Sequence, residues 1–268
     1  MTAKKITVPL LKEMKARKER IAALTAYDYV FGTLLDEAGI EIILVGDSCA
    51  MVVSGHENTL SLTMDEAVYH CRAVRRAVSR ALLVADMPFL SFQISVEEAL
   101  RNAGRFFKEA DVDAVKIEGG ALMAETVRRC VEAGMPVMGH LGLRPQSVKQ
   151  LGGFALQANS QEDAHHLLDD ALELERAGAF SLVLEKIPAE VARQVTNKLA
   201  IPTIGIGAGP HCDGQILVTH DVLGMFEKFQ PKFVRRYAEM AGDIKTACKK
   251  YIDDVKANAF PNKDESYL

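Results

Sequence analysis

The sequence is poor in cysteine and aromatic residues, and it has no tryptophan among its 268 residues. Its five cysteines are an odd number without a Cys-x-x-Cys pair, which excludes a disulfide-stapled domain and favours a reducing compartment. Long hydrophobic runs are also missing. The longest stretch without a charge, residues 199–212, spans 14 residues and contains two prolines and three glycines. Because a membrane-spanning helix needs about 20 mostly apolar residues, the sequence predicts no such helix.

An excess of positive charge is absent as well. The 32 Lys and Arg residues against 36 Asp and Glu residues leave a net charge of −4, which argues against a general nucleic-acid-binding surface. Residues 1–20 are basic, but they lack the apolar stretch and small-residue cleavage site of a secretory signal. We therefore expect a cytoplasmic protein that has neither nucleic acid nor membrane as a partner.

What the chain does contain is a regular alternation of short apolar runs and longer amphipathic segments. The runs show no period-two alternation, as is typical of parallel strands covered on both faces. The segments between them have helix signals, such as the capping pattern that begins at Thr63 and the apolar stripe that follows Ser95. The eight predicted strands are Ile21–Ala26, Ile42–Val45, Ala81–Ala85, Ala114–Ile117, Pro136–Gly139, Ser181–Leu184, Pro202–Ile206 and Gln215–Thr219.

Eight such units within about 220 residues predict an α/β fold, a (β/α)8 TIM barrel formed by one domain over residues 1–268. We expect a short N-terminal helix, capped by Thr7, and additional helices near the C-terminus, where residues 242–268 read as a charged helix with a loose polar end. A doubly wound sheet is the alternative. It is disfavoured because Ala26 to Tyr29, rather than a glycine-rich phosphate loop, follow the first strand.

Ionisable residues stand at the ends of five consecutive predicted strands. Catalytic groups of such barrels lie at the carboxyl ends of the strands, so we expect these side chains to share one rim. Asp47, Asp86 and Glu118 supply hard oxygen ligands, which suit Mg²⁺ better than Zn²⁺. The alternative is that each carboxylate caps the helix that follows it.

The same rim carries Lys116, His140 and Glu185. Lys116 and Glu118 are two apart on a strand and point to one side, either as a structural ion pair or beside an anionic substrate. His140 is either a donor to substrate or a hydrogen-bonded core histidine. Glu185, at the end of an apolar strand, is a candidate general base, or else a salt-bridge partner of the basic residues that follow it.

Several short motifs, taken in order, resemble one known family, ketopantoate hydroxymethyltransferase, from about residue 6 to residue 260. Each motif alone is weak, but their order and spacing together are highly specific. The motifs are Leu24-Thr25-Ala26-Tyr27-Asp28-Tyr29, Val45-Gly46-Asp47-Ser48, Gly55-His56-Glu57-Asn58-Thr59-Leu60, Asp86-Met87-Pro88-Phe89, Val115-Lys116-Ile117-Glu118-Gly119-Gly120, Gly139-His140-Leu141-Gly142-Leu143, Pro145-Gln146-Ser147, Gly205-Ile206-Gly207-Ala208-Gly209 and Asp213-Gly214-Gln215.

The resemblance implies a (β/α)8 barrel of the phosphoenolpyruvate mutase and isocitrate lyase group. It also implies transfer of a hydroxymethyl group from 5,10-methylenetetrahydrofolate to 3-methyl-2-oxobutanoate through a Mg²⁺-stabilised enolate, giving 2-dehydropantoate for pantothenate synthesis. A homodecamer is a further implication. The implied roles are Mg²⁺ binding by Asp47, Asp86 and Glu118, oxoacid binding by Asp47, Ser48, Asp86, Lys116 and His140, and proton abstraction by Glu185.

Two competing functions remain open from the sequence. One is a Mg²⁺-dependent carbon–carbon lyase or mutase that acts on a related oxoacid. The catalytic loop with a cysteine that such lyases would be expected to have is not found in the sequence. The other is a barrel that binds an oxoacid without turning it over.

Overall fold

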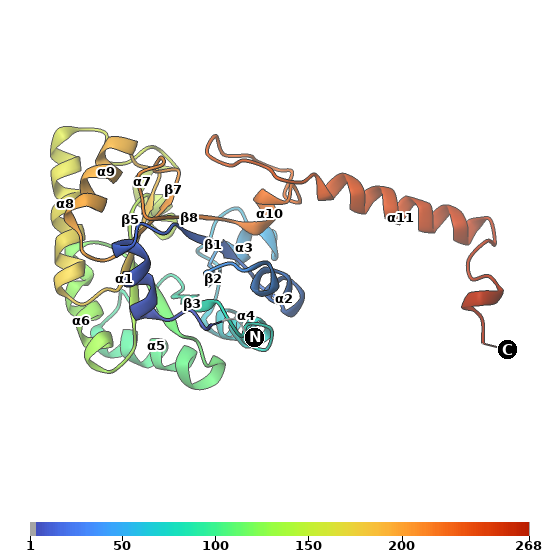
Figure 1. Cartoon of the computed structure of the whole chain (residues 1–268), viewed down its shortest axis with the longest axis horizontal. Coiled ribbons are helices and arrows are strands. Elements are labelled where there is room, and N and C mark those ends of the chain that lie inside the picture. Colours follow the sequence, from blue (N-terminus) through green and yellow to red (C-terminus); the bar gives the residue numbers. More distant parts are fainter. Residues whose placement is uncertain (1–3, 268) are drawn as a thin grey trace. The chain divides into compact units, whose positions relative to one another are not determined.

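The computed structural model describes residues 4–267 and forms a closed barrel of eight parallel strands (Figure 1). The strands follow one another around the barrel in chain order, and the eighth pairs with the first. The predicted (β/α)8 barrel is confirmed, and the doubly wound alternative is wrong because that sheet would have open edges. The strands are β1 (Ile21–Thr25), β2 (Ile42–Val45), β3 (Leu82–Asp86), β4 (Ala114–Glu118), β5 (Val137–Gly142), β6 (Ser181–Glu185), β7 (Thr203–Ile206) and β8 (Gly214–Leu217).

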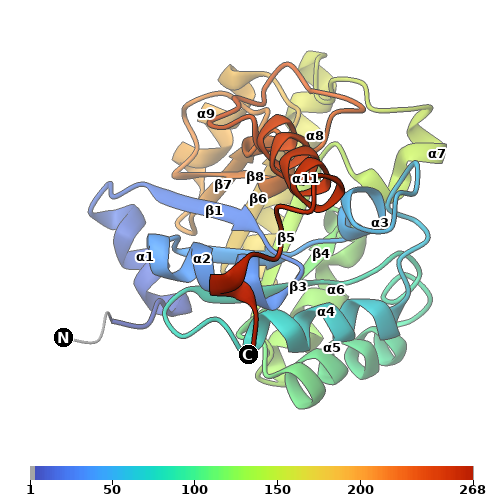
Figure 2. The same cartoon turned by 90° about the vertical axis from the view of Figure 1, so that its right-hand side faces the viewer.

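Helices surround the strands of the barrel (Figures 1 and 2). Sequence signals begin several of them: the Thr63 hydroxyl accepts a hydrogen bond from the Glu66 N–H, and the Glu66 side chain reciprocates. The helices are α1 (Val8–Ala16), α2 (Tyr29–Ala38), α3 (Cys49–Val52), α4 (Met64–Arg75), α5 (Val96–Ala110), α6 (Ala124–Glu132), α7 (Val148–Leu151), α8 (Gln161–Arg176) and α9 (Ala189–Lys198), with 3-10 turns η1 (Ala121–Met123) and η2 (Pro145–Ser147).

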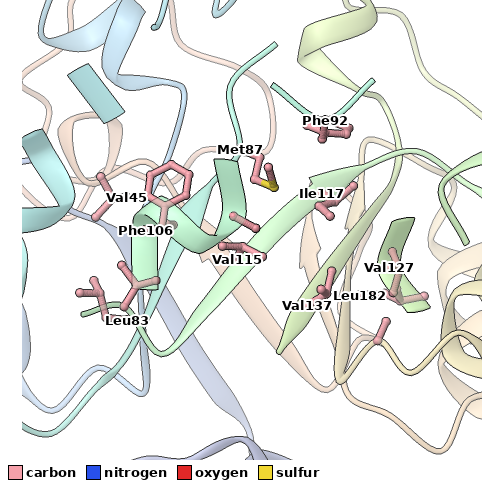
Figure 3. Close-up of a cluster of buried hydrophobic side chains, with 14 of the residues drawn as sticks. Val45, Leu83, Met87, Phe92, Phe106, Val115, Ile117, Val127, Val137 and Leu182 are labelled. Carbon is pink, nitrogen blue, oxygen red and sulfur yellow. The ribbon is translucent and has the colours of Figure 1, made fainter. Parts of the chain in front are cut away.

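Two apolar layers hold the barrel together. Alternate strand residues such as Leu83, Val115 and Leu182 pack outward against the helices, in the cluster drawn in Figure 3. Their neighbours along the strands, including Val84 and Ala114, belong to a second cluster inside the barrel. Since side chains alternate along a strand, this division fixes which later residues of each strand face the interior.

Helix α1 contributes to the inner layer. Its Leu11 and Met14 are buried in the same cluster as interior residues from all eight strands. The Lys15 ammonium donates to two carbonyl oxygens and to the Asp213 carboxylate at 2.9 Å, which ties α1 to the segments that flank β7. Thr7 occupies the cap position that was predicted, but its side chain makes no capping hydrogen bond.

The chain divides into two compact units, residues 1–218 and residues 219–268. Residues 219–268 contain α10 (Thr219–Val222), α11 (Met240–Lys256) and the 3-10 turn η3 (Lys263–Glu265), and α11 is the charged helix predicted near the C-terminus. Helix α11 buries none of its residues. Across residues 4–267, no helix has the length and apolar character needed to cross a bilayer. The single domain over residues 1–268 stays a prediction.

Candidate active site

The register of the barrel places the predicted polar residues next to one another. Asp86 is paired with Lys116 across β3 and β4, and Glu118 is paired with His140 across β4 and β5. Each is an even number of positions from an interior apolar residue of its own strand, so all four face into the barrel. Glu185 ends β6 opposite Gly142. The predicted rim is therefore a buried cluster at the carboxyl ends of the strands.

Lys116 is the central cation of this cluster. Its side chain is 4% exposed, and its ammonium lies 2.8 Å from Asp86 Oδ1 and 3.8 Å from Glu118 Oε1. Burial by itself lowers the pKa of Lys116, but the negative charges of Asp86, Glu118 and Asp47 outweigh burial and raise it. Lys116 is thus held charged among carboxylates, and its nearest partner is Asp86 rather than the strand neighbour Glu118.

Asp47 and Ser48 reach the cluster from the turn after β2. The Asp47 N–H donates to Asp86 Oδ2 at 3.1 Å, which joins the two acidic residues directly. Ser48 Oγ lies 2.8 Å from the hydroxyl of Tyr27, a residue that is almost fully buried. All five residues predicted to contact substrate, Asp47, Ser48, Asp86, Lys116 and His140, therefore lie in one connected region.

The crowding of carboxylates shifts their pKa values. Burial, with the charges of Asp86 and Glu118 next in importance, raises the pKa of Asp47 well above its usual value. Burial also raises the pKa of Asp86, with Lys116 acting in the opposite direction. For Glu118, contacts with His140 and Lys116 outweigh burial and lower the pKa. An added cation would relieve the repulsion among these groups.

The helix-capping alternative is wrong for the three carboxylates. The cap positions of the helices that follow β2, β3 and β4 are occupied by Ser48, Ser95 and Gly120, not by an acidic residue. The hydroxyl of Ser95 accepts the capping hydrogen bond from the Glu98 N–H. The acidic side chains are left to face the barrel interior.

His140 connects the cluster to Glu185. Its Nδ1 lies 3.2 Å from Glu118 Oε1, and its Nε2 lies 3.1 Å from Glu185 Oε2. Burial and Lys116 lower the pKa of His140, but Glu118 and Glu185 outweigh them and raise it to about 9. Nδ1 also lies 3.1 Å from Lys116 Nζ, so this nitrogen stands between an ammonium and a carboxylate, whereas Nε2 faces Glu185. Glu185 thus pairs with His140 and not with the basic residues that follow it.

The donor set suits Mg²⁺, because all three predicted ligands are carboxylates. Asp86 Oδ1 and Glu118 Oε1 are buried and make no hydrogen bond of normal geometry, and both already lie beside positively charged or protonatable nitrogens, Lys116 Nζ and His140 Nδ1. In residues 4–267, however, no group of three or more His, Cys, Asp or Glu side chains is already gathered closely enough to hold an ion. The chemistry fits the ion, and convergence on one ion stays a prediction.

Sequence reasoning assigned no site role to Tyr27 and Gln146. Tyr27 lies within the family motif of residues 24–29, yet only the fold shows that its hydroxyl contacts the Ser48 hydroxyl. Gln146 is 4% exposed, although it lies in a short turn after β5, where a polar residue usually faces solvent. Its burial beside Asp47 is a contact across 99 positions of the chain, which no local pattern encodes.

The sequence matches the family model described as ketopantoate hydroxymethyltransferase over residues 5–263. The chain belongs to the ketopantoate hydroxymethyltransferase family. The resemblance predicted from the ordered motifs is confirmed, and with it the prediction of an enzyme of this family.

Curated relatives in the ketopantoate hydroxymethyltransferase family match this chain along nearly their whole length. A 3-methyl-2-oxobutanoate hydroxymethyltransferase from Syntrophus aciditrophicus is 54% identical over 265 residues, which cover 99% of this chain and 97% of the relative. One with the same name from Chlorobaculum tepidum is 52% identical over 266 residues, covering 98% and 96%.

Solved structures show the same fold at low identity. A phosphonopyruvate hydrolase in complex with oxalate and Mg²⁺ superposes with a TM-score of 0.62 at 12% identity, covering 96% of this chain and 92% of that one. A 2,3-dimethylmalate lyase, a member of the phosphoenolpyruvate mutase and isocitrate lyase superfamily, gives a TM-score of 0.60 at 15% identity, covering 97% and 88%. These neighbours support the barrel alone.

Proposed function

We propose that this chain transfers a hydroxymethyl group from 5,10-methylenetetrahydrofolate to 3-methyl-2-oxobutanoate, giving 2-dehydropantoate in pantothenate synthesis. The observation that carries the proposal is the buried cluster of Asp86, Lys116, Glu118, His140 and Glu185 on four consecutive strands of a barrel of this family. A substrate that has a keto group next to its carboxylate suits this site, because the charged Lys116 can bind the carboxylate and the acidic residues can hold a cation near the keto oxygen.

Within this proposal, Lys116 and Ser48 bind the oxoacid. Lys116 stays charged in the barrel, so it can meet the substrate carboxylate without a change of protonation. Ser48 is oriented by the Tyr27 hydroxyl and offers a further hydrogen bond. Asp47 and Asp86 lie beside both, and the Nε2–H of His140, 3.1 Å from Glu185 Oε2, is shared between Glu185 and the oxoacid.

Asp47, Asp86 and Glu118 would hold Mg²⁺. The ion, when bound, would act as a Lewis acid toward the keto group of the oxoacid. Glu185 accepts the proton from C3 of the oxoacid, and His140 keeps the Glu185 carboxylate oriented during that step. C3 then forms its bond to the one-carbon unit, which is at the oxidation level of formaldehyde. The two bonds that join this carbon to nitrogens of the folate break, and one water supplies the hydroxyl oxygen. The second hydrogen of that water and the proton taken from C3 end on the released tetrahydrofolate, so no redox partner is needed.

We further propose a homodecamer that works in the cytoplasm, without nucleic acid or membrane as partner. The net charge of −4 supports the absence of a nucleic-acid partner, and five free cysteines support a cytoplasmic location. Sedimentation velocity at micromolar concentration tests the assembly, and a monomer would contradict it.

A product assay tests the proposed reaction. We expect 2-dehydropantoate from 3-methyl-2-oxobutanoate only when both methylenetetrahydrofolate and Mg²⁺ are present, and loss of product on chelation with EDTA. Cleavage or rearrangement of an oxoacid without folate would instead support a lyase or mutase. Tight oxoacid binding with no turnover would support a binding protein.

A further inference from the structure

We propose that Gln146 is a positioning residue that sets the Asp47 and Glu118 carboxylates for divalent-cation binding. The inference rests on the proposed function, because it concerns the cation that this function requires. Gln146 lies in the 3-10 turn η2 after β5, whereas Asp47 follows β2 and Glu118 ends β4. One residue thus contacts acidic groups that come from two other units of the barrel.

Two different groups of Gln146 make these contacts. The side-chain Nε2 donates to Asp47 Oδ2 at 3.1 Å, and the backbone N–H donates to Glu118 Oε2 at 3.1 Å. Both carboxylates are about 5% exposed, so neither oxygen can readily exchange these donors for water. Each carboxylate therefore has one oxygen fixed by Gln146.

The orientation of the Gln146 amide is determined by two further contacts. Nε2 also donates to the Met87 carbonyl at 2.8 Å, which can only accept, and Oε1 accepts from Gln93 Nε2 at 3.1 Å. A flipped amide would point its oxygen at Met87 O and at Asp47 together. Both amide hydrogens are thus committed, one to the β3 end and one to Asp47.

This arrangement turns the second oxygen of Glu118, Oε1, toward the centre of the cluster, where it faces Lys116 and His140. Glu118 Oε1 has no hydrogen bond of normal geometry while Oε2 is held by Gln146. Residues that orient metal ligands in this way typically change metal affinity by 10–100-fold when they are replaced. Gln146 therefore acts through Asp47 and Glu118 rather than on the substrate.

The test compares Gln146→Met with Gln150→Met. The first keeps the side-chain volume and the backbone N–H but removes the amide. The second makes the same exchange at an exposed glutamine of the neighbouring helix α7. Mn²⁺, used as the probe, is titrated into each full-length protein without substrate, and bound ion is measured by electron paramagnetic resonance. Far-UV circular dichroism checks that each variant is folded.

For Gln146→Met we expect the Mn²⁺ dissociation constant to rise about tenfold, with Gln150→Met within twofold of wild type. Gln93→Ala, an exposed loop substitution that removes the donor to Gln146, should raise it about threefold. A folded Gln146→Met that binds Mn²⁺ within twofold of wild type would overturn the proposal. If that variant does not fold, unchanged affinity in Gln93→Ala would do so.

The wild type separates this inference from the proposed function. If wild type binds Mn²⁺ and converts the oxoacid while the Gln146 and Gln93 variants bind equally well, only the positioning role fails. A wild type that binds no divalent ion would overturn the metal-dependent function itself, and the role of Gln146 with it.

Discussion

Replacing Lys116 by methionine removes the one ammonium that lies among the buried carboxylates, while keeping an unbranched side chain of similar volume. Coulomb's law at 2.8 Å and an effective dielectric constant of about 20 gives about 6 kcal/mol for the Asp86 pair. The desolvation cost of the lysine, several kcal/mol, offsets part of this attraction. We therefore expect Lys116→Met to lower the free energy of unfolding by about 3–5 kcal/mol.

A second substitution, at Asp86, tests whether the loss of stability comes from the charge interaction. Asp86→Asn alone should destabilise the protein, because Lys116 loses its nearest partner. In the Lys116→Met background the same exchange removes an uncompensated buried charge, and an amide oxygen can still accept from the Asp47 N–H. There it should raise the free energy of unfolding by about 1 kcal/mol or more.

The measurement is equilibrium urea unfolding in EDTA, at one fixed protein concentration because of the proposed assembly. Far-UV circular dichroism is the suitable signal, since the chain has no tryptophan to report by fluorescence. The electrostatic account of the cluster would be refuted if Lys116→Met were as stable as wild type within 1 kcal/mol. It would also fail if Asp86→Asn destabilised both backgrounds equally.

Further predictions concern a buried acceptor and a glycine. Asp36→Ala should cost about 2–4 kcal/mol, because its carboxylate accepts from the backbone N–H groups of residues 79–81. Burial raises the pKa of Asp36, but these hydrogen bonds outweigh burial and lower it. The difference in unfolding free energy between wild type and Asp36→Ala, measured by urea unfolding, should therefore hold above about pH 4 and shrink below it. Gly142→Ala should lower kcat at least about tenfold, because its Cβ would lie 2.2 Å from the Glu185 carbonyl. Gly39→Ala is the control, because Gly39 has a φ of 90°, close to the 89° of Gly142, but a Cβ there would have nothing within 4 Å. It should leave kcat unchanged. Equal losses of kcat by the two variants in steady-state assays would contradict the clash at Gly142.

The sequence predicted the barrel well because its strands are continuous apolar runs, and Ile42–Val45 matches its observed bounds. For other strands, the observed last residue differs from the predicted one. Asp86, Glu118 and Glu185 are the last residues of their strands, although the apolar pattern stops one residue earlier. Backbone pairing continues around the barrel past the point where hydrophobicity ends, which makes these side chains interior groups.

The pairing within the site could not be predicted from spacing. The spacing of Lys116 and Glu118, two positions apart on one strand, favours an ion pair between them, whereas the register across β3 and β4 brings Asp86 closer to Lys116. Closeness in sequence likewise favours a basic residue after Glu185 as its partner, but the partner is His140 on the neighbouring strand. Both contacts depend on how the strands are staggered, which is a property of the whole barrel and not of any local segment.

Hydrogen exchange at C3 of 3-methyl-2-oxobutanoate in deuterated solvent, measured by proton NMR without folate, tests the central claim most directly. Wild type with Mg²⁺ should exchange this hydrogen. Glu185→Gln should lose exchange and turnover while retaining Mg²⁺-dependent oxoacid binding, and Glu190→Gln, at an exposed carboxylate of α9, should exchange normally. Exchange by Glu185→Gln at a rate near that of wild type, or none by wild type, would contradict the account.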